Sequence, residues 1–202
     1  MKEFLDFYTV RNNALLMADR ILKEGFYPDV LYMLLRGGSV LGNVISEYFR
    51  VAGNPDKPVF VAAVAAKSYT GVAQRETAVK IEGWTLDPRQ LSPDSKILLT
   101  DDIFDSGRTL NRIARELLEG GIRRENLKIA VHDYKIKHYD PEQTALPIQP
   151  DFYARRFEIS RPEEEIWIHY LSHELVGLTE EEFRREYRER YPELKDFPWQ
   201  SD

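Results

Sequence analysis

The chain has 202 residues, 43% of them hydrophobic and 31% charged, so it can bury a core without disulfides or a structural metal. It contains no cysteine, which excludes disulfide scaffolds, thiolate zinc sites, iron–sulfur clusters and thiol nucleophiles. The net charge of −6 disfavours a nucleic-acid partner. The longest apolar run, Val59–Ala66, is far shorter than the ~20 residues that cross a bilayer, and acids near the N-terminus disfavour a signal peptide. We therefore expect a soluble, cytoplasmic protein with no membrane partner.

The first part of the chain alternates helical and strand-like patterns. Apolar residues at helical spacing predict a helix over Arg11–Glu24, which Gly25 ends. The continuous apolar run Val30–Leu35 predicts a buried strand, and a helix with one buried face follows from Val40 to Tyr48. Val59–Ala66 is the next buried strand. The polar segment that follows it, Lys67–Thr77, lacks periodicity and is predicted to be a loop.

The alternation continues to the end of the chain. Strands are predicted at Lys96–Thr100, Leu127–Tyr134, Phe152–Ile159 and Glu165–Tyr170, with a helix at Thr109–Leu118. A capping box then opens an exposed, charge-rich helix over Thr179–Glu189. Strands interleaved with helices predict an α/β fold with a mostly parallel sheet covered on both faces.

The chemistry concentrates in Ile97–Leu110, where a buried strand ends in two acids, Asp101 and Asp102, and a third acid precedes Ser-Gly-Arg-Thr. In open α/β sheets, ligands bind at the carboxyl ends of the strands. A glycine-containing turn at a helix N-terminus presents backbone N–H groups that suit a phosphate. Paired carboxylates suit ribose hydroxyls, directly or through Mg²⁺. A simple helix cap would explain one Asp-Ser-Gly, but not three acids here. No P-loop or G-x-G-x-x-G fingerprint occurs.

This segment resembles the phosphoribosyl-pyrophosphate (PRPP) signature of type I phosphoribosyltransferases, which reads two acids, two apolar residues, then Asp-Thr/Ser-Gly and a Thr. The resemblance implies that Asp101 and Asp102 contact the ribose hydroxyls and hold Mg²⁺, directly or indirectly. It also implies that Asp105 lies near the base as the catalytic acid/base. The same resemblance assigns the 5′-phosphate to the turn formed by Asp105, Ser106, Gly107, Arg108 and Thr109.

Two further loops resemble parts of the purine enzymes of this family. Arg36-Gly37-Gly38 follows the first sheet strand and resembles their pyrophosphate-binding loop, in which a guanidinium and freed amides suit the anion. Taken alone, it would be a plain strand-to-helix turn. A second stretch resembles their mobile loop, which closes over the reaction centre and excludes water. Its matching residues are Ser68, Tyr69, Gln74 and Arg75.

The base-binding residues rest on the resemblance alone. Lys135 is expected to end the fourth strand and, by resemblance, to donate to the purine O6. Trp167 and Ile168 resemble the hood strand, whose aromatic side chain stacks on the purine, although a tryptophan beside isoleucines is more often a core residue. The resemblance implies a type I fold with a small hood, a domain over residues 1–174 with its hood mainly from about 136–174, and a helical extension over 175–202.

The resemblance predicts transfer of the 5-phosphoribosyl group from PRPP to N9 of a 6-oxopurine, as in purine salvage, with Mg²⁺ as cofactor and pyrophosphate as product. It also implies a homo-oligomer, a dimer or tetramer. Two alternatives stay open: a regulator that senses PRPP or a nucleotide on the same fold, and a transferase for a non-purine base. The choice among hypoxanthine, guanine and xanthine also stays open. His169 and His173 lack further ligands for a zinc site, and His132 is expected to be a satisfied sheet residue.

Overall fold

The computed structural model describes residues 2–70 and 77–193. These residues form two compact units. The larger spans Tyr8–Glu165, and the smaller is drawn from both ends of the chain, within Met1–Phe7 and Ile166–Asp202. Residues 136–165, which the resemblance places in the hood, lie in the larger unit. They include parts of the last two strands of its sheet.

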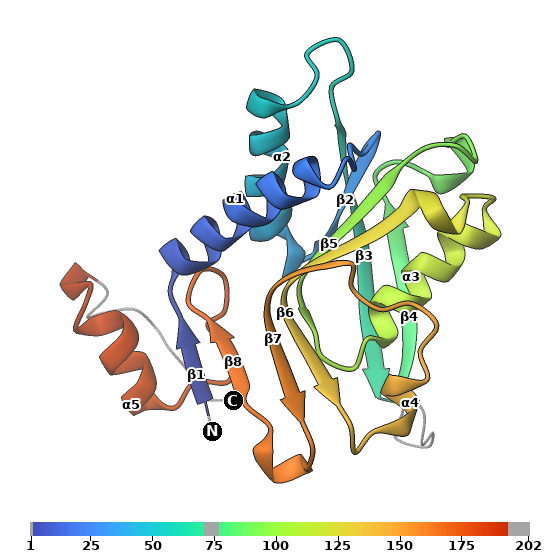
Figure 1. The fold of residues 1–202 in the computed structure, drawn as a ribbon. Coiled ribbons are helices and arrows are strands. Elements are labelled where there is room, and N and C mark those ends of the chain that lie inside the picture. The colour runs from blue at the N-terminus through green and yellow to red at the C-terminus, as the bar shows by residue number, and fades with distance from the viewer. Residues whose placement is uncertain (1, 71–76, 194–202) are drawn as a thin grey trace. The chain divides into compact units, whose positions relative to one another are not determined.

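A six-stranded sheet in the order β4-β3-β2-β5-β6-β7 forms the larger unit (Figure 1). All neighbours in it are parallel except β3 and β4, which pair antiparallel at one edge. The strands are β2 (Val30–Leu35), β3 (Phe60–Thr70), β4 (Thr77–Trp84), β5 (Ile97–Phe104), β6 (Leu127–Lys137) and β7 (Phe152–Ile159). The predicted mostly parallel sheet is thus confirmed.

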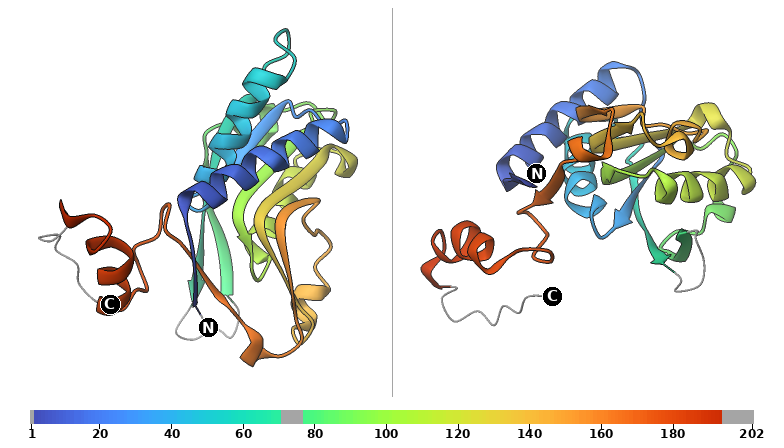
Figure 2. Two further views of the ribbon diagram at one scale, coloured as in Figure 1. Left: turned by 60° about the vertical axis from the view of Figure 1, so that its left-hand side comes forward. Right: turned by 90° about the horizontal axis from the view of Figure 1, so that it is seen from below.

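Helices cover both faces of this sheet (Figure 2). The apolar stripe of α3 (Arg108–Glu119) packs on one face, and α1 (Phe7–Lys23) and α2 (Gly38–Ala52) pack on the other. Successive residues of β2 alternate between the two cores: Tyr32 belongs to the α3 side and Leu31 to the other. Both are fully buried, so the continuous apolar run of β2 reflects a strand covered on both faces.

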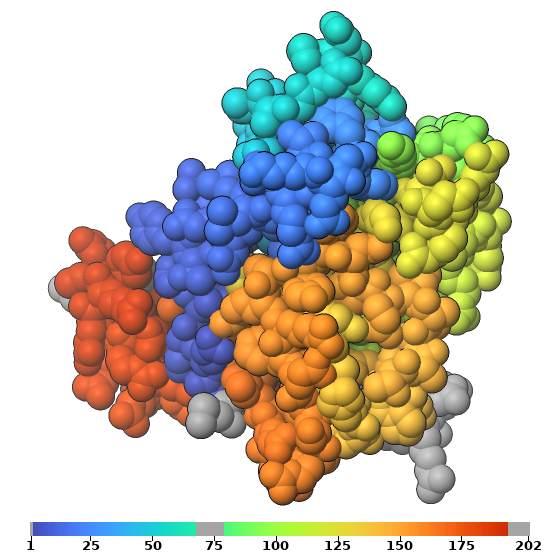
Figure 3. Space-filling model, viewed as in Figure 1, coloured from blue at the N-terminus to red at the C-terminus, as the bar shows by residue number. Residues whose placement is uncertain are grey.

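The helix α1 also lies against β7. A hollow of about 180 Å³ there is lined in part by Met17, Arg20 and Tyr153. Figure 3 shows this face, with α1 in blue above the orange β7. Among the described residues, no helix is both long and apolar enough to span a membrane.

The smaller unit joins the two ends of the chain in one sheet. Its strands β1 (Lys2–Leu5) and β8 (Trp167–Tyr170) pair in parallel. The helix α5 (Glu180–Phe183) begins at the capping box predicted at Thr179, and a π-helical turn, Arg184–Arg188, continues it. A small core of Leu178, Phe183 and Tyr187 packs with Phe4 and Leu171, so both termini contribute to this unit.

The prediction of a loop over Lys67–Thr77 is wrong at both of its ends. The strand β3 continues to Thr70, and β4 begins at Thr77. Along β4, half-buried Val79 and Ile81 alternate with exposed Lys80 and Glu82, as expected for an edge strand with one covered face. Lys67 of β3 forms an ion pair with Glu82 at 3.0 Å, so polar residues in this segment pair across the hairpin.

Candidate functional site

Two loops meet where β2 and β5 end, because these strands are neighbours in the sheet. A methyl group built on Gly37 would lie 2.3 Å from a carboxylate oxygen of Asp102, and one built on Gly38 would lie 2.3 Å from the carbonyl oxygen of Thr100. Only residues without a Cβ allow this approach. The structure therefore brings the Arg36-Gly37 loop, predicted to bind pyrophosphate, directly against the paired acids. Arg36 itself is exposed.

The two acids predicted to contact ribose are half-buried at the end of β5. The main-chain N–H of Asp102 donates to the Asp101 carboxylate at 3.0 Å. Burial and the adjacent negative charge of Asp102 raise the pKa of Asp101 well above its ordinary value. Such a pair is suited to hydroxyl groups or to a cation that offsets its charge.

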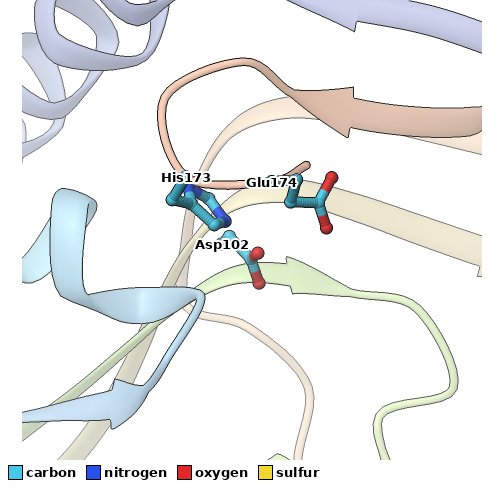
Figure 4. A group of neighbouring side chains, drawn as sticks. All are labelled: Asp102, His173 and Glu174. Carbon is cyan, nitrogen blue, oxygen red and sulfur yellow. The ribbon is translucent and has the colours of Figure 1, made fainter. Parts of the chain in front are cut away.

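Figure 4 shows Asp102 at the end of β5, and His173 and Glu174 on the turn after β8. Asp102 belongs to the larger unit and the other two to the smaller. Within the smaller unit, His173 stacks on Tyr170 with ring centroids 5.3 Å apart, and His169 is bonded to the carbonyl of Glu174 at 3.1 Å. Among the described residues, no cluster of possible metal ligands contains both histidines.

The turn after β5 forms a hollow at the N-terminus of α3. Gly107 has φ +70°, and a Cβ there would lie 2.2 Å from the ring of Phe104 and 2.7 Å from Leu146. Both the backbone conformation and the close packing thus require glycine. The hollow is about 180 Å³ and is lined by Asp101, Ile103, Asp105, Ser106, Gly107, Thr109 and Leu110. The first-turn N–H groups of α3 are available to an anion there.

Arg108 stands apart from the other residues of this turn. Its guanidinium forms an ion pair with Glu142 of the short helix α4 (Pro141–Thr144). The pair is largely exposed, so it contributes little stability, up to about 1 kcal/mol. Arg108 also begins α3, and its N–H lies 3.5 Å from the Ser106 hydroxyl. The main chain of Arg108 is therefore part of the helix start, while its side chain is held by Glu142.

Two lysines hold the carboxylate of Asp105. The Nζ atoms of Lys135 and Lys137 lie 3.0 and 3.1 Å from the same oxygen, Oδ1. Burial opposes the charge on Asp105, but the two ammonium groups more than offset it and lower the pKa of this carboxyl. Sequence reasoning found Lys135 and missed Lys137. The spacing of two residues on one strand was the available signal, since it places both side chains on the same face.

The prediction that the fourth strand ends at Lys135 is wrong. The strand β6 runs on to Lys137, because ion pairs allow both lysines to be buried within it. Lys137 also contacts Glu165 at 2.7 Å, and Glu165 accepts a hydrogen bond from the hydroxyl of Tyr139. Burial opposes the charge on Lys137, but Glu165 and Asp105 together raise the pKa of its ammonium group.

The remaining predicted residues lie in three places. Trp167 and Ile168 are adjacent on β8 in the smaller unit, where Trp167 is 59% exposed and Ile168 is 5% exposed. Ser68 and Tyr69 belong to β3. Gln74 and Arg75 lie outside the described residues. His132, expected to be a satisfied sheet histidine, is fully buried on β6 and bonded to Asn13 and Asp133.

Several solved structures share this fold. A purine phosphoribosyltransferase from Pyrococcus horikoshii Ot3 is 22% identical, with a TM-score of 0.63, over 88% of this chain and 98% of that one. A hypothetical protein from Neisseria gonorrhoeae with bound ppGpp is 17% identical, with a TM-score of 0.62, over 87% and 90%. A xanthine-guanine-hypoxanthine phosphoribosyltransferase from Helicobacter pylori is 16% identical, with a TM-score of 0.56, over 85% and 92%. At these identities the likeness shows the fold alone.

No curated protein sequence matches the chain. A family model for the phosphoribosyl transferase domain matches residues 9–149, which is well over half of its length. The matched region contains the glycine loop after β2, the acids at the end of β5 and the turn that opens α3. The chain therefore belongs to the phosphoribosyl transferase domain family.

Proposed function

We propose that the protein transfers the 5-phosphoribosyl group of PRPP to N9 of a 6-oxopurine and releases pyrophosphate. The observation that carries this proposal is the arrangement at one sheet edge. A glycine loop abuts two acids, an anion-sized hollow opens at a helix start, and Asp105 is held by two lysines. The first two features suit a phosphorylated sugar, and the third suits a base with a carbonyl oxygen.

The PRPP half of the site uses main-chain donors together with one exposed cation. The turn from Ser106 to Thr109 would hold the 5′-phosphate through N–H groups and hydroxyls. Arg36 and the amides of the Gly37 loop would hold the pyrophosphate and stabilise the charge that grows on it as it leaves. Asp101 and Asp102 would bind the ribose hydroxyls. This division explains how an acidic chain binds a strongly anionic substrate.

The donor set also fits a magnesium ion. Two adjacent carboxylates are hard oxygen ligands, and the raised pKa of Asp101 shows that negative charge is costly there, which a divalent cation would relieve. Asp101 and Asp102 would hold the ion, directly or through water. When bound, it would supply positive charge to neutralise the pyrophosphate oxygens.

The base half of the site centres on Asp105. In the ionised state favoured by its lysines, Asp105 would accept and return the N7 proton of the purine. The ammonium group of Lys135 has three N–H donors, so it can remain paired with Asp105 and still donate a hydrogen bond to O6 of the purine. The exposed ring of Trp167, beside Ile168, would provide a stacking surface for the purine. The segment containing Ser68, Tyr69, Gln74 and Arg75 would exclude water from an oxocarbenium-like transition state.

A direct assay tests this function. The protein would be incubated with PRPP and Mg²⁺ and, separately, with hypoxanthine, guanine, xanthine or adenine, and nucleotide and pyrophosphate would be measured. We expect product with at least one 6-oxopurine and little with adenine, whose amino group is a poor partner for a lysine donor. Product with none of the bases would overturn the proposal and favour a regulator. Product with adenine alone would contradict the base assignment.

A further inference from the structure

One buried glutamine lies behind the Asp105–lysine cluster. Gln143 belongs to α4, the short helix in the connection from β6 to β7, and only 3% of it is exposed. The carboxylate of Asp140 caps this helix, accepting from the N–H groups of Glu142 at 3.0 Å and Gln143 at 3.2 Å. A single turn is thereby fixed at the end of β6, and its glutamine points inward.

The side-chain amide of Gln143 is fully engaged by the main chain of the site. Its Nε2 donates to the carbonyl oxygen of Asp105 and, at 2.8 Å, to that of Lys135. Its Oε1 accepts from the N–H of Lys137 at 2.7 Å. Asp105, Lys135 and Lys137 therefore each have one backbone group bonded to this one amide.

These bonds begin where the sheet ladder stops. The last paired residues of β5 and β6 are Phe104 and Tyr134. Immediately beyond them, the chain of Asp105 turns toward α3 while β6 continues beside β7. Gln143 fills this gap between the diverging segments, so it connects the acid of the cluster to the strand that carries both lysines.

We infer that Gln143 is a positioning residue that sets the distance between the Asp105 carboxylate and the ammonium groups of Lys135 and Lys137. Without its two N–H donors, two buried carbonyl oxygens lose their partners, and the turn at Asp105 is free to move away from β6. Its effect on transfer rests on the proposed function, whereas its effect on the carboxylate does not.

The test compares Gln143→Met with a matched change. Methionine has nearly the same length and no amide, so it fills the space and removes all three bonds. The control is Gln149→Met in the same connection. Gln149 donates to the main-chain carbonyl oxygens of Leu146 at 3.2 Å and Gln143 at 3.4 Å, and accepts from the Tyr134 hydroxyl at 2.8 Å. None of these bonds involves the acid or the lysines of the cluster, or the side-chain amide of Gln143.

The first readout is the titration of Asp105 in the full chain, followed by carboxyl ¹³C NMR and assigned with Asp105→Asn. In the wild type and in Gln149→Met we expect a midpoint below the ordinary value of 3.8. In Gln143→Met the midpoint should rise toward that value, since the lysines no longer hold the carboxylate. An unchanged midpoint in folded Gln143→Met would overturn the inference, whether or not the protein proves to be a transferase.

The second readout is kinetic and applies if transfer is observed. We expect kcat to fall about 10- to 100-fold in Gln143→Met, as for a displaced catalytic group, with little change in KM for PRPP. A loss of kcat/KM that comes only from a higher KM for PRPP, with kcat unchanged, would contradict the inference. Failure of Gln143→Met to fold, while Gln149→Met folds, would also overturn it, because Gln143 would then hold the fold rather than the site.

Discussion

At the scale of single residues, the site places carboxylates in opposite electrostatic environments. Asp101 is crowded by Asp102, whereas Asp105 faces two ammonium groups. The first pair is thereby suited to a cation or to hydroxyls, and Asp105 is suited to remain ionised at neutral pH. Asp101 and Asp105 are close together in the sequence, yet their different neighbours suit them to different tasks.

Asp105→Asn should retain the fold but lower turnover by about 100-fold or more, because an amide cannot take up the purine proton. Steady-state kinetics with saturating purine would measure the effect. Asp94→Asn is a suitable control, since Asp94 is 69% exposed and pairs with Arg123 at the surface. Turnover equal to that of the wild type in Asp105→Asn would remove Asp105 from the mechanism.

The same variant has a pH signature in stability. Because the pKa of Asp105 is lowered on folding, its ion pairs contribute fully above the unfolded value, near 3.8, and this contribution is lost as the pH falls through the folded value. We expect Asp105→Asn to cost on the order of 1 kcal/mol at neutral pH, since the carboxylate is 45% exposed and screened by water. Urea unfolding at several pH values should show this difference vanish in acid. A difference independent of pH would contradict the ion-pair account.

Asp101→Asn should have the opposite effect on stability. The raised pKa of Asp101 means that ionisation penalises the folded state once the pH exceeds the unfolded value of 3.8. Replacing the carboxyl by an amide removes that penalty, so the free energy of unfolding at pH 7 should increase while ribose binding weakens. Paired denaturation and PRPP-binding measurements would check this. A less stable variant would argue against the charge crowding.

At this scale, sequence reasoning could place a group wherever a local pattern was sufficient. The paired acids near the end of β5 and the glycine loop after β2 were placed because each is joined to a recognisable strand. Lys137 and Gln143 were missed for a different reason. Their roles depend on how β6 and its connection return to Asp105. The spacing of Lys135 and Lys137 places them on one face of the strand, but it does not reveal that this face meets Asp105.

At the scale of elements, the start of α3 depends on one glycine more than on any side chain. Gly107→Ala places a side chain on a left-handed backbone, which costs ~1–2 kcal/mol of stability. The clash of this side chain with Phe104 costs about 1–3 kcal/mol more. Gly25→Ala is the matched control: Gly25 has φ +79° but nothing within 4 Å of a built Cβ. Chemical denaturation should show the larger loss in Gly107→Ala. Equal losses would show that strain alone requires glycine at residue 107.

Strands with a clear apolar pattern were easier to predict than strands without one. The predicted bounds of β2 and β7 match the structure, because continuous or alternating apolar runs end at clear turns. The strands β1 and β4 were not predicted. The first is only four residues long and pairs with a strand from the far end of the chain, and the second follows a polar stretch whose charges pair across strands.

At the scale of the whole molecule, the residues proposed to bind the substrates come from both units. The larger unit holds the residues proposed to bind PRPP, and the smaller one holds Trp167. Trp167→Ala should therefore weaken purine binding while leaving PRPP binding near its wild-type strength, because stacking on an aromatic ring is lost. Calorimetric titration with each substrate would measure both. Equal weakening of both would indicate a disturbed fold instead.

The parallel pairing of β1 with β8 also bears on how the chain is made. During synthesis, residues 2–5 emerge first, but the strand that pairs with them is made only after all six strands of the larger sheet. The larger unit contains its own core and can fold in the meantime, whereas the smaller one must close a loop of nearly the whole chain. The unit that carries Trp167 would then be the last to assemble, after the residues proposed to bind PRPP are in place.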